Sequence, residues 1–289
     1  KNPNAPINKW CKKMEQRPDC VHIHTTYKDV PREWLGGDLI ESAEIMAQLD
    51  PKRYRWIWLG EATGIDETIY YMFSESHIQE PAQKHYGLIG IGGDYGQQNA
   101  TTFQAFGIDE YNQKFQGLGE YYHSGRESGT QKSPSEYAGD LMDFIGTLAE
   151  RYGCEHFCVY LDPSASGLAE EIRRQIRSCP YWVVLRQAEN DVALGINRVQ
   201  RLLTFGILQV CQEQPEAIGE FRTYEYDKKS IERGKEEPVK IGDHCMDAIR
   251  YVVMGTWIRL KRFLPEAERE DLLYRGKLYE EDDADDGYY

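Results

Sequence analysis

Residues 88–123 read LIGIGGDYGQQNATTFQAFGIDEYNQKFQGLGEYYH, and this stretch decides the fold. It holds three runs with strand character, at 88–92, 101–107 and 114–123. Because no helical segment separates these runs, we expect three consecutive strands joined as an antiparallel meander.

Downstream of this meander, helical and strand patterns alternate. Apolar residues recur at helical spacing over 135–152, and a short apolar strand follows at 157–161. The remaining expected elements are a helix containing Leu168, Ile172 and Ile176, strands at 182–185 and 207–210, helices at 191–205 and 215–224, a polar excursion or hairpin at 226–239, and a last helix at 243–262. The order β-β-β-α-β-α predicts an α/β protein with a ribonuclease-H-like mixed sheet flanked by helices.

The composition is that of a folded protein with an uneven charge. Apolar residues make up 40% of the 289 residues and charged residues 28%, which excludes wholesale disorder, a collagen-like repeat and a small disulfide scaffold. No apolar run approaches the roughly 20 residues that span a bilayer, so no membrane partner is expected. The net charge of -14 excludes a surface that is basic throughout, and much of it lies in the tail 266–289, which we expect to be disordered.

Two aspartates stand where predicted strands end. Asp94 lies in Ile91-Gly-Gly-Asp-Tyr-Gly96, where glycines let a metal ion or a phosphate approach the backbone closely. Asp162 follows the strand at 157–161, and active sites of α/β proteins gather at the carboxyl ends of such strands. Each also has a plain structural interpretation, Asp94 as a turn residue and Asp162 as the start of a turn that caps the next helix.

A third group of polar residues opens the last predicted helix. The sequence Gly242-Asp243-His244-Cys-Met-Asp247 places His244 and Asp247 on one helix face. Asp243 suits the N-cap position, and we assign it that role. Asp247 precedes the apolar run at 248–253, and a carboxylate on the buried side of a helix must be paired or bound to metal.

Asp94, Asp162 and Asp247 together form the donor set of a two-metal phosphodiesterase. Hard carboxylate oxygens hold two Mg²⁺ or Mn²⁺ ions about 3.5–4 Å apart, one to generate the attacking water and the other to stabilise the leaving oxygen. We therefore expect divalent-metal-dependent DNA cleavage that stops when any of the three acids is replaced by Asn, with the fold intact. Replacing His244 by Ala should reduce cleavage without necessarily abolishing it.

Several motifs resemble those of the large terminase subunit of tailed bacteriophages. They are Trp56-Ile-Trp-Leu-Gly-Glu61, Ile69-Tyr-Tyr-Met-Phe73, Gly93-Asp-Tyr-Gly96, Leu161-Asp162 and His244-x-x-Asp247, and the stretches 2–3 and 24–31 are similar to the end of an ATPase domain. Members of this family join an N-terminal packaging ATPase domain to a C-terminal ribonuclease-H-like nuclease domain. The resemblance covers nearly the whole chain except the acidic tail.

The resemblance implies a domain organisation and an activity. The implied segments are a remnant of the ATPase domain at 1–65, a linker at 66–86, the nuclease domain at 87–265 and the acidic tail at 266–289. Asp94, Asp162 and Asp247 would be the metal-binding acids with His244 beside them, and 226–239 the hairpin that gates DNA access. The implied enzyme is an endonuclease that cuts concatemeric double-stranded DNA in the host cell cytoplasm, and the full-length protein would have the portal and the small terminase subunit as partners.

The sequence departs from the family in its nucleotide-binding motif. The packaging ATPase needs a G-x-x-x-x-G-K-[ST] loop, and no such run occurs here. We therefore expect no ATP hydrolysis, and we expect the chain to be a C-terminal piece of the family's protein.

Other interpretations remain open at this stage. An actin-like phosphotransferase would need paired glycines after Asp162, which are absent, whereas a transposase or a junction resolvase would be expected to have a more basic body. A non-catalytic docking module would use the acids only for structure. Within 226–239, four basic residues are expected either to form a mobile DNA-binding rim or to lie on a solvated loop: Lys228, Lys229, Arg233 and Lys235.

Overall fold

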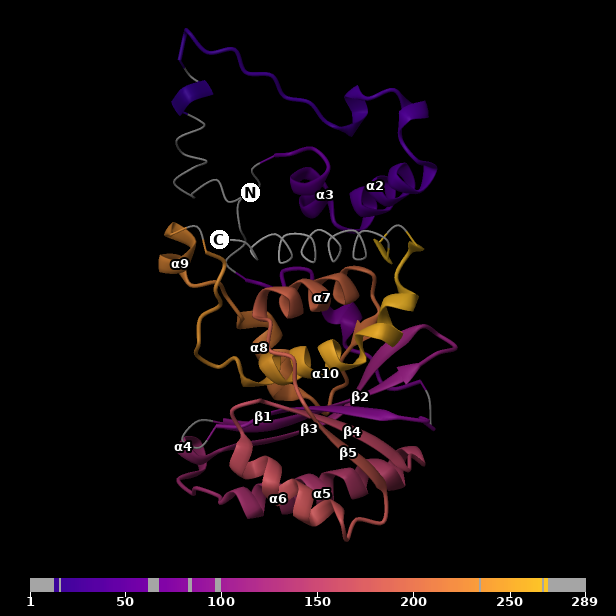
Figure 1. Cartoon of the computed structure of the whole chain (residues 1–289), viewed down its shortest axis with the longest axis vertical. Coiled ribbons are helices and arrows are strands. Elements are labelled where there is room, and N and C mark those ends of the chain that lie inside the picture. The colour runs from indigo at the N-terminus through magenta and orange to yellow at the C-terminus, as the bar shows by residue number, and fades with distance from the viewer. Residues whose placement is uncertain are drawn as a thin grey trace, which may run out of the picture. The chain divides into compact units, whose positions relative to one another are not determined.

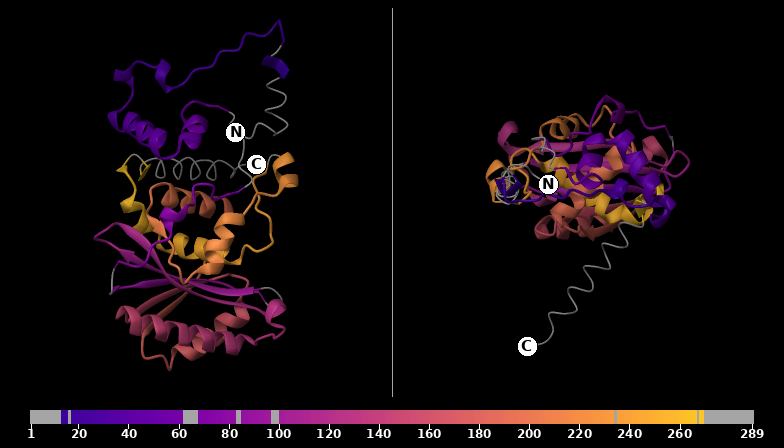
Figure 2. Two further views of the ribbon diagram at one scale, coloured as in Figure 1. Left: turned by 180° about the vertical axis from the view of Figure 1, so that it is seen from behind. Right: turned by 90° about the horizontal axis from the view of Figure 1, so that it is seen from above.

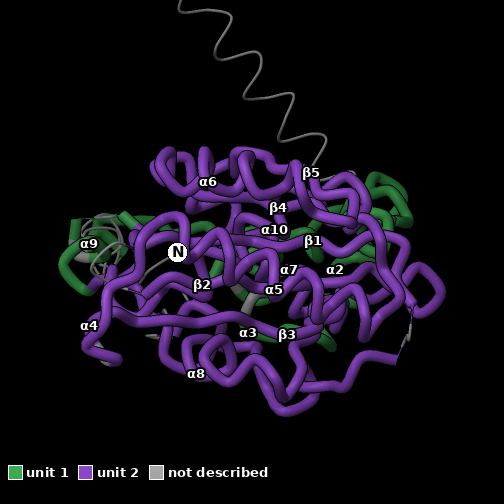
Figure 3. Tube along the Cα trace, turned by 90° about the horizontal axis from the view of Figure 1, so that it is seen from below, with its two compact units in different colours: residues 1–65, 228–235, 261–289 green, residues 66–227, 236–260 purple. Residues whose placement is uncertain are grey.

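The computed structural model describes residues 13–15, 17–61, 68–82, 85–96, 100–233, 235–266 and 268–269. The chain divides into two compact units (Figure 3). Unit 1 comprises Lys1–Ile65, Lys228–Lys235 and Lys261–Tyr289, and unit 2 comprises Asp66–Asp227 and Glu236–Leu260. Most of the predicted acidic tail, from residue 270 onward, and four residues of the predicted linker lie outside the described residues.

Unit 2 is built on a six-stranded mixed sheet of order β5-β4-β1-β2-β3-β6 (Figure 1). The first three strands pair antiparallel in sequence order, β4 and β5 continue parallel to β1, and β6 pairs parallel to β3. The strands are β1 Ile89–Asp94, β2 Ala100–Asp109, β3 Lys114–Ser124, β4 His156–Leu161, β5 Trp182–Gln187 and β6 Leu208–Gln209. The predicted mixed α/β fold, with its antiparallel meander and ribonuclease-H-like order, is confirmed.

Helices cover both faces of this sheet. Helices α5 and α6 lie on one face, and α7, α8 and α10 lie on the other, as Figure 1 and the opposite view in Figure 2 show. The helices of unit 2 are α4 Gly125–Ser128, α5 Pro134–Tyr152, α6 Ser166–Ile176, α7 Val192–Thr204, α8 Pro215–Thr223 and α10 His244–Leu260, with a 3-10 turn at Glu75–His77. None of the described helices combines the length and the apolar character needed to cross a membrane.

The sequence Ile-Gly-Ile-Gly of β1 explains how both faces are packed. Ile89 and Ile91 point into the apolar core beneath α5, where they are fully buried. Gly90 and Gly92 point to the other face, and a Cβ atom on Gly92 would lie only 1.8 Å from the carbonyl oxygen of Ala248 in α10. Helix α10 therefore rests directly on the backbone of β1, which brings its first turn to the end of that strand.

Local sequence signals determine where α5 begins and ends, on the face of the sheet opposite to α10. Ser133 and Glu136 form a reciprocal capping box at the start of α5, with Pro134 at the first helical position. Gly153 ends the helix with φ of 55°, a left-handed conformation that favours glycine. These signals therefore set both ends of α5, the helix that precedes β4 in the chain.

The structure differs from the sequence prediction at three places. Asp94 is the last residue of β1 and not part of the following turn. Of the excursion and the hairpin predicted at 226–239, the described residues form an excursion, with a short helix, α9 Lys228–Glu232, and an antiparallel bridge between Tyr226 and Pro238 in place of the two paired strands of a hairpin. This charged segment lacks the alternating apolar residues that hold a two-stranded ribbon together. The last helix ends at Leu260 and continues as a 3-10 turn at Lys261–Phe263.

The described part of unit 1 is helical. Tyr27 links its loop to the second helix, because its hydroxyl lies 2.9 Å from that of Tyr54 and its ring meets Trp58 edge-on. Its N-terminal segment holds α2 Gly37–Leu49 and α3 Pro51–Ile57, with 3-10 turns at Tyr27–Asp29 and Arg32–Trp34. Helix α9 and the 3-10 turn at Lys261–Phe263 also belong to unit 1. The assignment of 1–65 to the end of an ATPase domain stays a prediction.

Candidate active site

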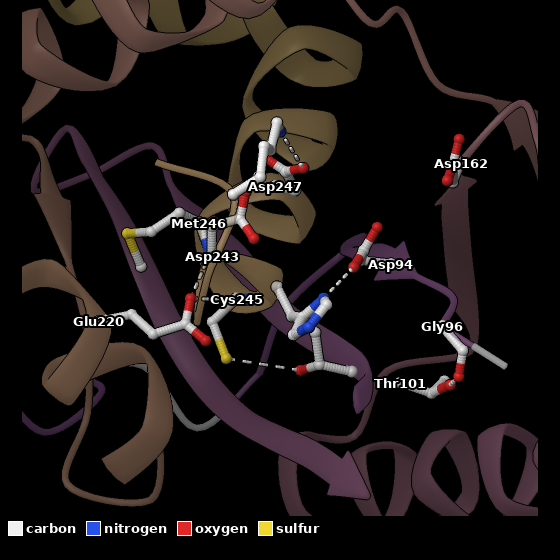
Figure 4. A network of polar contacts seen from close by, with 12 residues as sticks. Asp94, Gly96, Thr101, Asp162, Glu220, Asp243, Cys245, Met246 and Asp247 are labelled. Atoms are coloured by element: carbon white, nitrogen blue, oxygen red, sulfur yellow. Dashed lines mark hydrogen bonds and ion pairs between the residues drawn. The ribbon is translucent and has the colours of Figure 1, made fainter. Parts of the chain in front are cut away.

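Asp94 and Asp162 lie at the ends of two neighbouring strands, at the same edge of the sheet (Figure 4). Asp94 ends β1 and Asp162 follows β4, and these strands are parallel neighbours because Gly93 of β1 pairs with Leu161 of β4. The amide of Asp162 donates to the carbonyl oxygen of Gly93 at 3.1 Å, which extends the ladder by one step. This register places both carboxylates at the carboxyl ends of their strands, as expected for an α/β site.

Of the structural role considered for Asp162, the structure shows the turn but not the helix cap, because the N-cap residue of α6 is Ala165 and no side chain among the described residues caps that helix. Its carboxylate accepts hydrogen bonds from the amide and the hydroxyl of Ser164, at 3.0 and 2.7 Å. The amide of Ala165 donates to the carbonyl oxygen of Asp162 at 3.0 Å, which closes a turn before α6. The side chain is half-buried and keeps lone pairs for a further ligand.

His244, the first residue of α10, reaches across to Asp94. Its Nδ1 donates to Asp94 Oδ2 at 2.8 Å. This hydrogen bond raises the pKa of His244, and burial opposes it. Burial raises the pKa of Asp94, and the nearby carboxylates of Asp247 and Asp162 raise it further against the effect of His244. Asp247 and Asp162 are therefore both close enough to Asp94 to repel its carboxylate.

Asp247 is held between two cations. Arg250 Nη2 donates to its Oδ1 at 2.7 Å, and Lys240 Nζ lies 3.2 Å from its Oδ2. The side chain of Arg250 is 0% exposed, whereas that of Asp247 is 13% exposed. Lys240 also lies 3.2 Å from Asp243 Oδ2 and so joins the two acids of the first turn of α10. The expectation that Asp247 is paired or bound to metal agrees with this arrangement.

Asp243 occupies the N-cap position, but the carboxylate that caps α10 comes from elsewhere. The carbonyl oxygen of Asp243 accepts the first intrahelical hydrogen bond, from Asp247 N at 2.9 Å. The amides of Cys245 and Met246, which precede Asp247 in the first turn, both donate to Oε2 of Glu220, at 2.8 and 3.1 Å (Figure 4). The assignment of side-chain capping to Asp243 is therefore corrected, because Glu220 takes these amides and Oδ2 of Asp243 faces Lys240 instead.

Sequence reasoning missed Glu220. It lies on the buried face of α8 with Ala217 and Phe221, and burial raises its pKa to about 8. A carboxylate at helical spacing among apolar residues is the signal that could have identified it, because a buried acid requires a partner.

The donor chemistry fits a divalent cation. Three carboxylates supply the hard oxygen ligands that Mg²⁺ and Mn²⁺ prefer, and the repulsion that Asp247 and Asp162 exert on Asp94 favours a bound cation. Within the described ranges, however, no three His, Cys, Asp or Glu side chains come close enough to hold one ion together. Arg250 and Lys240 provide positive charge beside Asp247, Lys240 also lies beside Asp243, and His244 is hydrogen-bonded to Asp94.

The four predicted rim residues belong to unit 1 and not to the unit that carries the acids. Lys228, Lys229, Arg233 and Lys235 are exposed. Their action on DNA at the candidate site stays a prediction.

Comparison with solved structures finds the large terminase from a thermophilic bacteriophage. Its structure in complex with ADP covers 89% of this chain and 60% of its own, with a TM-score of 0.66 and 28% sequence identity. Another crystal form of the same terminase covers 87% of this chain and 59% of its own, at a TM-score of 0.66 and 29% identity. The predicted resemblance to the large terminase subunit is confirmed.

The match to the large terminase is partial in length. This chain spans about 60% of the terminase from that thermophilic phage. The nuclease domain of the P22 large terminase also aligns, over 66% of this chain and 92% of its own, with a TM-score of 0.48 and 17% identity. No protein-family model matches the chain, and a search of curated proteins returns no match.

Proposed function

We propose that unit 2 is the metal-dependent endonuclease of a DNA-packaging terminase. The observation that supports this most is the convergence of Asp94, Asp162 and Asp247 from β1, β4 and α10 at one edge of a ribonuclease-H-like sheet. Phosphodiester hydrolysis by paired cations needs acids in this kind of arrangement and no protein nucleophile.

The residues around the acids have separable roles in this proposal. Asp94, Asp162 and Asp247 would hold two divalent cations, Mg²⁺ or Mn²⁺. Such ions, when bound, generate the nucleophilic water and stabilise the leaving oxygen. Arg250 fixes the orientation of Asp247 from the buried side. His244 holds Asp94 through a charge-assisted hydrogen bond and keeps a proton at Nδ1.

Lys240 provides an exposed cation at the same place. Its side chain is 60% exposed, and its Nζ lies beside the carboxylates of Asp243 and Asp247. A phosphate backbone that approaches the acids meets this ammonium group, which offsets part of the repulsion between DNA and the site.

The terminase resemblance guides the choice of substrate and partners. We infer that the substrate is concatemeric double-stranded DNA, cut in the host cell cytoplasm. We also infer that the full-length protein works with the portal and the small terminase subunit. Because the chain has no G-x-x-x-x-G-K-[ST] run, its own activity is proposed to be DNA hydrolysis without ATP hydrolysis.

The proposal is tested by incubating supercoiled plasmid with the whole chain in MnCl₂, MgCl₂ or EDTA. We expect nicked and linear products with either metal and none in EDTA. Asp162→Asn is the cleanest control, because this carboxylate is half-buried and bonded only to Ser164 among the described contacts. Cleavage by Asp162→Asn at the wild-type rate would remove Asp162 from the site, and intact plasmid with wild-type protein would favour a docking module.

A further inference from the structure

We propose that Glu220 is a positioning residue of the nuclease site, which sets the first turn of α10 so that His244 and Asp247 face Asp94. The inference rests on the proposed function. It concerns a residue on another helix that touches none of the three acids through any described hydrogen bond.

The first turn of α10 needs an external acceptor. The first amides of an α-helix have no intrahelical partner, and a buried amide must find one elsewhere. Cys245 and Met246 are buried, so water cannot fully take that role. Glu220, only 9% exposed, provides one oxygen that accepts from both amides.

These two amides lie between the functional side chains. His244 precedes them and bonds to Asp94, and Asp247 follows them and pairs with Arg250 and Lys240. A rotation of this turn would therefore move His244 and Asp247 together.

The same chain offers a matched control for helix capping alone. Glu120 on β3 accepts from the first-turn amides of α8, with 2.8 Å to Glu216 N and 3.2 Å to Ala217 N. Burial raises the pKa of both glutamates. The first turn of α8 carries none of the candidate site residues, and Glu220 lies later in the same helix. Glu120→Ala therefore tests whether loosening α8 alone, with the Glu220 carboxyl group retained, reproduces the effect of Glu220→Ala.

Two measurements on the full chain test this inference. The first is hydrogen exchange of peptides covering residues 243–250, without metal. In Glu220→Ala, the amides of this segment should exchange faster than in the wild type. In Glu220→Gln, their exchange rate should stay near that of the wild type, because the side-chain amide oxygen accepts the same hydrogen bonds. In Glu120→Ala, their exchange rate should also stay near that of the wild type. The second is calorimetric titration with MnCl₂. Glu220→Ala should weaken Mn²⁺ binding about 10-fold to 100-fold, the range found for residues that orient metal ligands, whereas Glu220→Gln and Glu120→Ala should change it less than about threefold.

The outcomes separate a positioning role from a structural one. Faster exchange in Glu220→Ala with wild-type Mn²⁺ affinity would overturn the inference, as would unchanged exchange or a Glu220→Gln variant that behaves like Glu220→Ala. Equal weakening by Glu120→Ala would also overturn it, because general loss of packing would then explain the effect. If the wild-type chain binds no Mn²⁺, the proposed function fails and the positioning role fails with it, whereas exchange still reports the cap without metal.

Discussion

Asp247→Asn should destabilise the protein as well as stop cleavage. The substitution leaves the guanidinium of Arg250 without its carboxylate, and Nε and Nη1 of this fully buried side chain have no hydrogen-bond partner among the described residues. Breaking a buried ion pair costs roughly 3–5 kcal/mol. The amide oxygen of Asn can still accept from Nη2 and water reaches this edge, so we expect a loss of about 2–4 kcal/mol. This corresponds to a Tm lower by roughly 5–15 °C.

The assay is urea unfolding of three variants without metal. Asp162→Asn is the matched control, with an expected loss below about 1 kcal/mol, because its carboxylate bonds only to exposed Ser164 among the described contacts. Asp247→Asn/Arg250→Met should recover most of the stability and no cleavage, because replacing a buried ion pair by apolar groups is often neutral. Equal stability of Asp247→Asn and Asp162→Asn would refute the reasoning and restore the sequence-based expectation that all three Asn variants keep the fold intact.

Three further perturbations test separate parts of the account. Gly92→Ala should lower the free energy of unfolding by about 1–3 kcal/mol or more and abolish cleavage, because its Cβ would clash with the backbone of α10. Gly87→Ala, which has open space around it, should do neither. Urea unfolding and plasmid nicking measure the two effects. Burial raises the pKa of Glu220 to about 8, so the native chain holds a proton that the unfolded chain releases near pH 4.5. The free energy of unfolding of the wild type should therefore fall relative to that of Glu220→Gln between about pH 4.5 and 8. A constant difference between the two free energies over this pH range would contradict this. Replacing Lys228, Lys229, Arg233 and Lys235 with Ala should weaken DNA binding at every sequence and lower the salt-dependence slope by about 0.9 per lost phosphate contact, and an unchanged slope would exclude the rim.

The sheet could be predicted from sequence because its signals are local. Apolar runs marked β1 to β5, and Asp94 and Asp162 could be placed at one edge because both follow strands of a predicted mixed sheet. The last helix was predictable from its long apolar run, and its first turn from Asp243 at the N-cap position.

What could not be predicted depends on contacts between distant segments. The spacing of Asp247 and Arg250 is visible in the sequence, but the burial of Arg250 follows from packing against Gly195 of α7. The capping carboxylate of Glu220 lies on another helix, so the local rule that assigned side-chain capping to Asp243 chose the wrong residue. The role of Gly90 and Gly92 also became clear only once α10 was seen resting on β1.

The central claim is that Asp94, Asp162 and Asp247 together hold divalent cations. Anomalous diffraction from crystals of the full chain soaked in MnCl₂ tests it most directly. We expect Mn²⁺ peaks within bonding distance of all three carboxylates, with Lys240 displaced from Asp247, and no peaks at this edge in Asp162→Asn/Asp94→Asn crystals. Mn²⁺ peaks elsewhere in the wild-type protein, or none at these acids, would contradict the account.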